Sequence, residues 1–364
     1  MTAPIASERG HGSPSLAPSV PASFADALAG QVARLFFDRQ LSKIEIANRL
    51  GISRFRVARL LDKALADGIV RIEFRDAPAS DRDLGLALER RFRIDRCIVA
   101  ADSDDPPGAA AQLAAELIDG VLESRQSIGV AWGSTVARVV AAMPPRADRS
   151  IDVVQLAGDS AAMGIGTAPG DATRLLAERL GGRPHALHAP TFVESRNLRM
   201  ALAREREIAQ TFAWFDRLSV ALIGIGAFEI RSTDPAGSRQ SGSSGTGPSR
   251  TETDQLGAPG AASSSLLRSG ALLPADLADL VAAGAVGDLV VHPFNVDGHF
   301  VAPDLAARAM AISVPALRKI PRVVAVATGA DKAVALRGAL RTGIVRMLVT
   351  DVDAATRLLE TEPA

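Results

Sequence analysis

The chain has 364 residues, which is long enough for two or three domains of ordinary size. Charged residues make up 23% of it and apolar residues 47%, which excludes a mainly disordered protein. Its single cysteine, Cys97, cannot close an intrachain disulfide, so a secreted disulfide scaffold is excluded and a reducing compartment is favoured. The apolar runs are too short to span a membrane, and no charged leader precedes an apolar run near residue 1. We therefore expect a cytoplasmic protein that contacts no membrane.

The formal net charge of zero hides an uneven distribution of charge. Residues 31–75 contain ten Lys and Arg residues against five Asp and Glu residues, so this segment carries +5 and the rest of the chain carries −5. Binding to nucleic acid depends on concentrated Lys and Arg side chains that meet phosphates. Residues 31–75 are therefore the candidate for such a contact.

Two segments are poor in bulky apolar side chains and rich in small or polar residues, at 1–23 and at 231–264. Such segments bury too little apolar surface to offset the entropy lost on ordering. We expect 1–23 to be a disordered tail and 231–264 to be a flexible insertion. The remaining sequence is expected to form a first domain at 24–75, a linker at 76–83 and a second domain at 84–364.

The first domain has apolar residues at helical spacing in three consecutive pieces, from Val32 to Leu41, from Ile44 to Leu50 and from Val57 to Leu65. Alternating apolar and charged residues over 69–74 then predict a strand. The first domain is therefore expected to contain helix, turn, helix and strand in this order.

Short polar signals separate these predicted helices. Ser42 can cap the second helix, and Glu45 three residues later completes a capping box. Gly51 supplies the reversal of the chain, and Ser53 can cap the third helix.

The third predicted helix presents a basic surface while its apolar residues face inward. A helix fits the major groove of B-DNA, and arginine is the side chain that most often reads guanine there. We expect contacts with double-stranded DNA from Ser42, Lys43, Ser53, Arg54, Phe55, Arg56 and Arg59. The alternative is a helical hairpin with a solvated basic face.

The second domain alternates short apolar runs with helical stretches. The runs predict strands at Cys97–Ala101, Ile128–Trp132, Val153–Ala157, Val220–Ile225, Leu289–His292, Val323–Ala327 and Met347–Thr350. Continuous apolar strands separated by helices favour an α/β fold with a mostly parallel sheet that helices cover on both faces. Ligands of such sheets bind in the crevice at the carboxyl ends of the strands.

The run LSKIEIANRLGISRFRVARLLDKALADGIVRI, from Leu41 to Ile72, resembles the winged helix-turn-helix of the SorC family of sugar-responsive bacterial transcriptional regulators. The likeness continues in order through IGVAWGSTV, VVQLAGD, APTFVES, ALIGIGAF, GAVGDLVVHPFNVDG and VAVATGADKAVALRGALRTGIVRMLVTD. This resemblance implies a Rossmann-like effector domain related to sugar-phosphate isomerases and deaminases. It also implies a sugar or sugar-phosphate effector and assembly into a homodimer or homotetramer.

One loop predicts an anion site in the effector domain. Gly133, Ser134 and Thr135 follow a predicted strand and open a helix, where backbone N–H groups and hydroxyls can hold an anionic oxygen. The alternative is a packing turn with a hydroxyl cap.

Further candidate effector contacts lie at the ends of later strands. Gly224 and Gly226 permit close approach to the backbone, although packing alone explains such a pair equally well. Asp297 is a candidate acceptor for sugar hydroxyls, and its Asp-Gly pair is also an ordinary turn signal. Lys332, shortly after Gly329, is placed to reach a phosphate, whereas a solvated lysine is the common case.

The chain shows no pattern for metal or hydrolytic chemistry. The histidines form no HExxH motif, and His185 and His188 are expected to point to opposite faces of a strand. Ser134 lacks the Gly-x-Ser-x-Gly elbow of serine hydrolases. We expect a regulator without cofactor or catalytic residues. The rival is a sugar-phosphate isomerase or deaminase with a DNA-binding head, for which Asp297 is the candidate base.

Overall fold

The computed structural model describes residues 24–70, 79–160, 169–228 and 264–360, and the chain divides into two compact units, Met1–Asp76 and Ala77–Ala364. Each unit is described by itself. The predicted tail and residues 231–263 of the predicted insertion lie outside the described residues. The predicted strand at 69–74 lies mostly outside them as well, and its described residues, Ile69 and Val70, form a bend.

The first unit consists, in its described part, of three helices around a small apolar core. The helices are α1 at Phe24–Phe37, α2 at Lys43–Leu50 and α3 at Arg54–Ala66. Val32, Ile46 and Val57, one from each helix, are fully buried together. These residues carry the helical spacing of the sequence, so the three predicted helices are confirmed.

The first helix ends earlier than predicted. It stops at Phe37, whereas the apolar spacing extends to Leu41. Gln40 has a φ of 52°, a left-handed conformation that a continuing helix excludes. Leu41 still packs against the core, from the connection that precedes α2.

The caps predicted for α2 and α3 are present. The N–H of Glu45 donates to the hydroxyl of Ser42 at 3.3 Å, and the N–H of Ser42 donates to Oε2 of Glu45 at 2.8 Å. Gly51 takes the left-handed conformation at the end of α2, and Ser53 accepts the N–H of Arg56 at 3.2 Å. Caps of this kind fix where α3 begins and therefore which side chains it exposes.

The second unit is built on a mainly parallel sheet with strand order β1-β9-β8-β5-β2-β3-β4. Its parallel strands are β1 at Arg96–Ala100, β2 at Ser127–Val130, β3 at Asp152–Gln155, β4 at Pro184–His185, β5 at Val220–Ala227, β8 at Arg322–Val326 and β9 at Met347–Asp351. An antiparallel hairpin of β6, Ala285–Leu289, and β7, His292–Asn295, continues from the end of β5. The α/β fold with a parallel sheet agrees with the prediction.

One predicted strand is wrong. The run Leu289–His292 crosses the turn between β6 and β7 instead of forming a single strand. Val290 has a φ of 63° and yet is buried, so the turn is made of apolar residues that lie inside the core. Turns of this kind normally carry Gly or Asn, and the sequence gives no such signal here.

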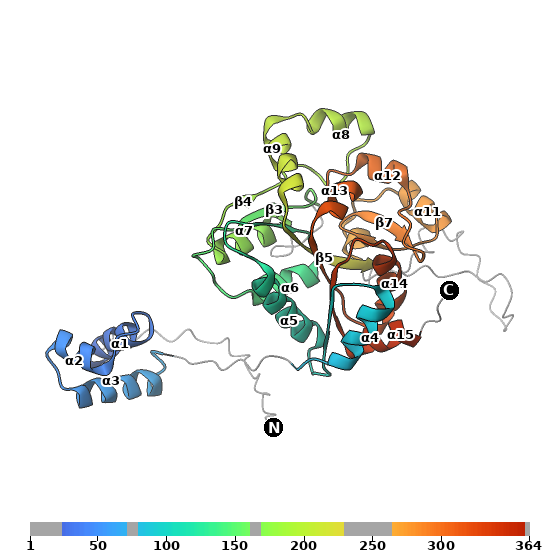
Figure 1. Ribbon diagram of the computed structural model, residues 1–364. Coiled ribbons are helices and arrows are strands. Elements are labelled where there is room, and N and C mark those ends of the chain that lie inside the picture. Colours follow the sequence, from blue (N-terminus) through green and yellow to red (C-terminus); the bar gives the residue numbers. More distant parts are fainter. Residues whose placement is uncertain (1–23, 71–78, 161–168, 229–263, 361–364) are drawn as a thin grey trace, which may run out of the picture. The chain divides into compact units, whose positions relative to one another are not determined.

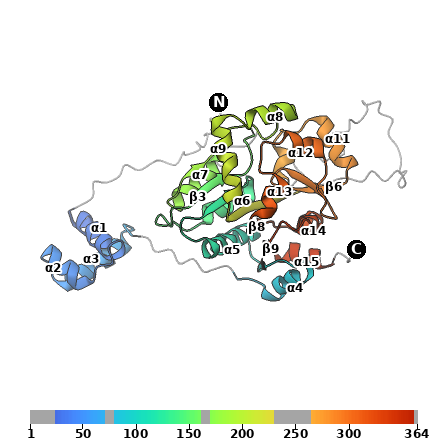
Figure 2. The same cartoon turned by 45° about the horizontal axis from the view of Figure 1, so that its top comes forward.

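Helices cover both faces of the sheet (Figures 1 and 2). In β5, Val220 and Leu222 pack on one face with α5, α6 and α7, while Ala221 and Ile223 pack on the other with α4, α9, α13, α14 and α15. The helices of this unit are α4 at Arg82–Phe92, α5 at Pro106–Val121, α6 at Ser134–Ala142, α7 at Pro169–Arg179, α8 at Arg196–Leu202, α9 at Arg206–Trp214, α10 at Ser265–Arg268, α11 at Pro274–Ala282, α12 at Pro303–Arg308, α13 at Val314–Lys319, α14 at Ala333–Arg341 and α15 at Val352–Glu360. The described residues also form the 3-10 turns η1 at Phe215–Arg217 and η3 at Ala330–Lys332.

The described part of the predicted linker, 79–83, belongs to this second unit. Ser80 forms an antiparallel bridge with Ala100, and Asp81 caps α4 by accepting the N–H of Leu84 at 3.0 Å. The cap explains why α4 starts at Arg82, within the segment expected to link the domains.

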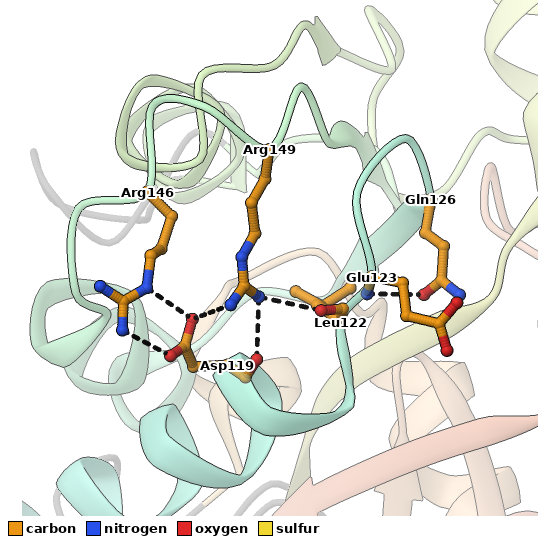
Figure 3. A network of polar contacts seen from close by, with 6 residues as sticks. All are labelled: Asp119, Leu122, Glu123, Gln126, Arg146 and Arg149. Carbon is orange, nitrogen blue, oxygen red and sulfur yellow. Dashed lines mark hydrogen bonds and ion pairs between the residues drawn. The ribbon is translucent and has the colours of Figure 1, made fainter.

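An ion-pair network fixes the amino ends of β2 and β3. Arg146 and Arg149, which lie between α6 and β3, both pair with Asp119 of α5, at 3.0 Å and 3.2 Å (Figure 3). Arg149 also donates to the carbonyl of Leu122 at 2.9 Å. These contacts tie the carboxyl end of α5 to the segment that leads into β3.

Two glycines provide a matched test of this packing. A Cβ on Gly182 would lie 1.5 Å from the carbonyl oxygen of Ile151, whereas a Cβ on the exposed helical Gly120 would meet nothing within 4 Å. We expect Gly182→Ala to destabilise the protein by roughly 1–3 kcal/mol or more. Gly120→Ala should stabilise it by about 0.5–1 kcal/mol, because the unfolded chain loses freedom. Denaturant unfolding checks both variants, and a loss of equal size in the two would contradict this account.

Candidate functional site

The strand order of the parallel sheet reverses between β2 and β5. From β2 the chain continues to β3 and β4 on one side, and from β5 it continues to β8 and β9 on the other. The segments that follow β2 and β5 therefore separate and leave a crevice at their carboxyl ends. This reversal makes the β2–β5 junction the first place to search for a ligand site.

A crevice with about 450 Å³ of space, part of it open to solvent, lies at this junction. Its lining comes from 131–136, 224–226, Ser265, Leu266, Asp288, Val290 and Lys332. Of the residues predicted to contact an effector, it brings together Gly133, Ser134, Thr135, Gly224, Gly226 and Lys332. Their positions arise from three separate strand ends.

The loop at 133–135 leads directly from β2 into α6. Gly133 has a φ of 128°, and the helix begins at Ser134 without a side-chain hydrogen bond at its cap. A side chain at Gly133 would stand 3.1 Å from the hydroxyl of Ser265. The loop therefore offers helix N–H groups and the hydroxyls of Ser134 and Thr135 to an anionic oxygen.

Lys332 brings a cation to the crevice from the end of η3. The side chain is partly buried, and its amine forms no hydrogen bond or ion pair within the described part of the chain. Burial lowers the pKa of Lys332, while the nearby carboxylates of Asp331, Asp288 and Asp351 act in the opposite direction. A lysine amine in this setting is best satisfied by an anionic ligand.

Asp288, on β6, is the acidic residue of the crevice, and sequence reasoning missed it. The residue is only 6% exposed, and its Oδ1 accepts the hydroxyl of Ser264 at 2.8 Å. Burial raises the pKa of the Asp288 carboxyl to about 7, against the opposing effects of the Ser264 hydrogen bond and the Lys332 charge. A lone aspartate inside the apolar run of 285–291 was the available signal.

Gly226 provides the room for this carboxylate. It faces Asp288 across the β5–β6 pairing, and a Cβ there would stand 2.1 Å from Oδ1 of Asp288 and 2.8 Å from the hydroxyl of Ser264. A Cβ on Gly224 would meet only Val136, at an ordinary 3.9 Å. The two predicted glycines therefore differ, since only the one at 226 is required by its neighbours.

Two predicted effector residues do not line the crevice. Asp297 is exposed and pairs with Arg341 at 3.4 Å, because the turn after β7 carries it to the side of α14. Gly329 ends the loop after β8, where its N–H donates to Asp351 at 2.9 Å. Gly329 thus helps to place Lys332, and the acidic residue that lines the crevice is Asp288 and not Asp297.

Trp132, at the end of the β2 loop, also lines the crevice. It is 7% exposed, and its Nε1–H has no acceptor within the described residues. A buried donor without a partner is unfavourable.

The basic surface of the first unit has the exposure expected from sequence. Arg54, Phe55, Arg56 and Arg59 of α3 are exposed, while Val57 on the same helix is fully buried. Phe55 is 67% exposed, and the guanidinium of Arg54 lies 4.9 Å from the centre of its ring. Lys43 is exposed at the start of α2. The hydroxyls of Ser42 and Ser53 serve as helix caps.

The histidines, the cysteine and possible metal clusters were the remaining candidates for chemistry in the part of the chain that the structure describes. It contains no group of three or more His, Cys, Asp or Glu side chains suited to a metal ion. His185 bonds to Asp152 at 2.9 Å, and His292 bonds to the carbonyl of Ile312 at 2.7 Å. Burial raises the pKa of the Cys97 thiol to about 12, which removes its reactive thiolate. None of the described helices is long and apolar enough to cross a bilayer.

The raised pKa of Asp288 predicts a pH-dependent stability. Between about pH 4 and pH 7 the folded chain keeps a proton that the unfolded chain releases, so the free energy of unfolding falls as pH rises across this interval. Asp288→Asn removes this effect. We expect its stability relative to wild type to increase up to about pH 7 and then to level off. Chemical unfolding of both proteins between about pH 5 and pH 8 measures the difference.

Asp297→Asn is the control, because it removes a carboxyl of the same kind from an exposed position, where charge pairs contribute little. The free energy of unfolding of this control should change with pH in the same way as that of wild type. Parallel curves for Asp288→Asn and wild type would show that the buried carboxyl has no influence on stability.

Comparison with known proteins places the chain in a family. Residues 76–239 and 256–360 match the sugar-binding domain family. The erythritol catabolism regulatory protein EryD of Brucella abortus is 25% identical over 339 residues, covering 92% of this chain and 96% of that protein. The deoxyribonucleoside regulator of Bacillus subtilis is 25% identical over 337 residues, covering 91% and 97%.

Solved structures share the fold. The full-length sorbitol operon regulator SorC of Klebsiella pneumoniae superposes with a TM-score of 0.63 at 24% identity, over 92% of this chain and 99% of that one. The relatives are named as regulators of transcription or catabolism, and their likeness extends across both units. The chain therefore belongs to the sugar-binding domain family.

Proposed function

We propose that operator binding by this regulator is controlled by a sugar or sugar phosphate bound in the crevice between β2 and β5. The observation that carries the proposal is the meeting of the 133–135 loop and Lys332 at the reversal of strand order. The loop offers N–H and hydroxyl donors, and the lysine offers a cation without a protein partner among the described residues. Together they suit a phosphate or another anionic group on a small polar ligand.

The first unit is proposed to bind double-stranded operator DNA through α3. Its exposed Arg54, Arg56 and Arg59 suit base edges or phosphates, and Phe55 offers an apolar surface beside them. Lys43, with Ser42 and Ser53 at the helix starts, suits the DNA backbone. Domain 24–75 would thus recognise DNA, and domain 84–364 would bind the effector and join copies of the chain.

The proposed assembly is a cytoplasmic homodimer or homotetramer. A single helix-turn-helix reads a short sequence, and operators with two-fold symmetry are matched by paired heads about one turn of DNA apart. An effector changes DNA affinity only if it binds more tightly to one arrangement of the heads than to another. In this scheme an effector bound in the crevice shifts the equilibrium between different placements of the DNA-binding domains in the oligomer.

A second candidate function is an isomerase or deaminase acting on a sugar phosphate. The observation in its favour is Asp288, whose carboxyl has a pKa of about 7 and lines the crevice, as a general base would. The relatives named above are regulators, which favours binding without turnover. A thermal-shift measurement and a turnover assay on the same sugar phosphate separate the two functions, since conversion of the ligand would establish the enzyme.

Removing the three arginines of α3 tests the DNA surface. A base-reading arginine contributes about 1–3 kcal/mol to operator affinity. A triple variant in which Ala replaces Arg54, Arg56 and Arg59 should therefore lose most specific binding. Fluorescence anisotropy with a duplex selected from a random pool measures it.

A triple Ala variant of Arg174, Arg206 and Arg357 is the control, because it removes the same charge from exposed positions of the second unit. Undiminished binding by a folded α3 variant would disprove the proposed interface. An equal loss in the control would show that net charge alone accounts for the effect.

The anion site is tested with a sugar phosphate and its unphosphorylated sugar. Charge-assisted hydrogen bonds are roughly twice as strong as neutral ones, so Lys332→Ala should weaken the phosphorylated ligand far more than the free sugar. Thr135→Val removes one hydroxyl at nearly constant volume and should show the same preference, more weakly. Titration calorimetry measures both variants, with the exposed Lys319→Ala as control. Equal losses for the two ligands would show that 133–135 is only a packing turn.

A further inference from the structure

Helix α3 carries an exposed aromatic side chain among its arginines. Phe55 is 67% exposed, the largest exposed fraction among the large apolar side chains of the described residues. Burial of such a ring against a partner is favourable, because its apolar surface leaves water. Arg54, Arg56 and Arg59 are exposed around it. The partner that fits this surface is therefore polyanionic and also offers an apolar group to the ring.

Two features fix the direction of the Phe55 side chain. Phe55 is the second residue of α3, and the start of the helix is set by Ser53, whose hydroxyl accepts the N–H of Arg56 at 3.2 Å. Val57 is fully buried, and side chains two residues apart on a helix point about 200° apart, so Phe55 points away from the core. Arg59 follows one turn later on the same outward face. Phe55 therefore stands at the N-terminal end of the surface that α3 exposes.

Arg54 restricts the ring of Phe55 further. Its guanidinium lies 4.9 Å from the centre of the ring, within the range of a cation–π contact. The guanidinium covers one face of the ring, which leaves the opposite face and the outer edge for a partner. A side chain that is already held in place loses less entropy when it binds. The ring is thus prepared for contact with a small apolar group.

We propose that Phe55 recognises the methyl group of thymine in the major groove and so specifies a base pair of the operator that the arginines do not. This inference rests on the proposed binding of DNA by α3. In a helix-turn-helix, the N-terminal residues of the recognition helix meet base edges. The thymine methyl is the apolar group displayed in the major groove, whereas arginine selects guanine by hydrogen bonds. A phenyl ring forms no such bond to a phosphate or a polar base edge, so the methyl group is the partner that it suits.

Deoxyuridine tests the methyl group alone, because it differs from thymidine only in lacking that group. Each thymine of a duplex selected from a random pool is replaced in turn, and fluorescence anisotropy measures the affinity of the full chain. We expect at least one position at which the replacement weakens binding by wild type about fourfold, the effect of one buried methyl group. Phe55→Ala should show no loss at this position. Phe55→Leu, which keeps an apolar side chain, should show part of it.

A second comparison places the methyl group on another base. At the sensitive position, a cytosine–guanine pair replaces the thymine–adenine pair, and 5-methylcytosine then restores the methyl group alone. Wild type should bind the methylated duplex about fourfold more tightly than the cytosine duplex, whereas Phe55→Ala should bind both equally. Phe37→Ala is the matched control, because it truncates another exposed phenyl ring, at the end of α1. It should keep the preference of wild type.

The outcomes separate this inference from the function on which it rests. If no deoxyuridine weakens binding by wild type, or if Phe55→Ala is weakened at the same position as wild type, Phe55 does not recognise a methyl group, although α3 still binds DNA. Loss of all binding by Phe55→Ala, with its fold shown to be intact by circular dichroism, also overturns the inference, because one methyl contact accounts for only a few-fold change. The ring would then act by insertion between base pairs. If wild type selects no duplex, the proposed DNA interface itself fails.

Discussion

A parallel sheet buried on both faces leaves its strand ends as the place where polar groups meet solvent, and this constraint organises the second unit. Its strands are nearly continuous apolar runs because helices pack on each side. At the amino ends of β2 and β3, Asp119 and its two arginines close the sheet. At the carboxyl ends, the reversal between β2 and β5 opens the crevice. A loop, a lysine and a carboxylate from distant parts of the sequence come together there for this reason.

The sequence was most informative where local physics decides the structure. Helical spacing, the Ser42 capping box and Gly51 determine the three helices of the first unit without help from distant residues. The same holds for most strands of the sheet, because a run of Val and Ile between helical stretches has few alternatives. The sequence also placed the 133–135 loop and Lys332 at strand ends, and both line the crevice, while their role in binding a ligand stays a prediction.

Two differences from the sequence predictions, the single strand expected at Leu289–His292 and the choice of Asp297, share one physical origin, the hairpin of β6 and β7. Its turn at Val290 and Val291 is buried and apolar, so its sequence resembles that of a strand. For this reason the sequence did not single out Asp288 as a residue of the crevice. Asp297 stands beside a Gly, which is a stronger local turn signal, and it was therefore predicted as the acidic effector contact instead. Only the pairing of β6 with the far end of β5, where Gly226 faces Asp288, shows which acid lies in the crevice. Such long-range pairing leaves little trace in a single sequence.

The position of Trp132 has a practical consequence. The chain has only two tryptophans, and the other, Trp214, lies against the ring of His185, with ring centres 4.3 Å apart, beside the edge strand β4. Indole emission responds to the polarity and hydrogen bonding of its surroundings, and Trp132 lines the crevice with an N–H that has no acceptor among the residues that the structure describes. In a protein with Trp214 replaced by Phe, ultraviolet fluorescence would therefore report occupancy of the crevice directly. Such a variant would allow the proposed binding of a ligand to be followed without an attached dye.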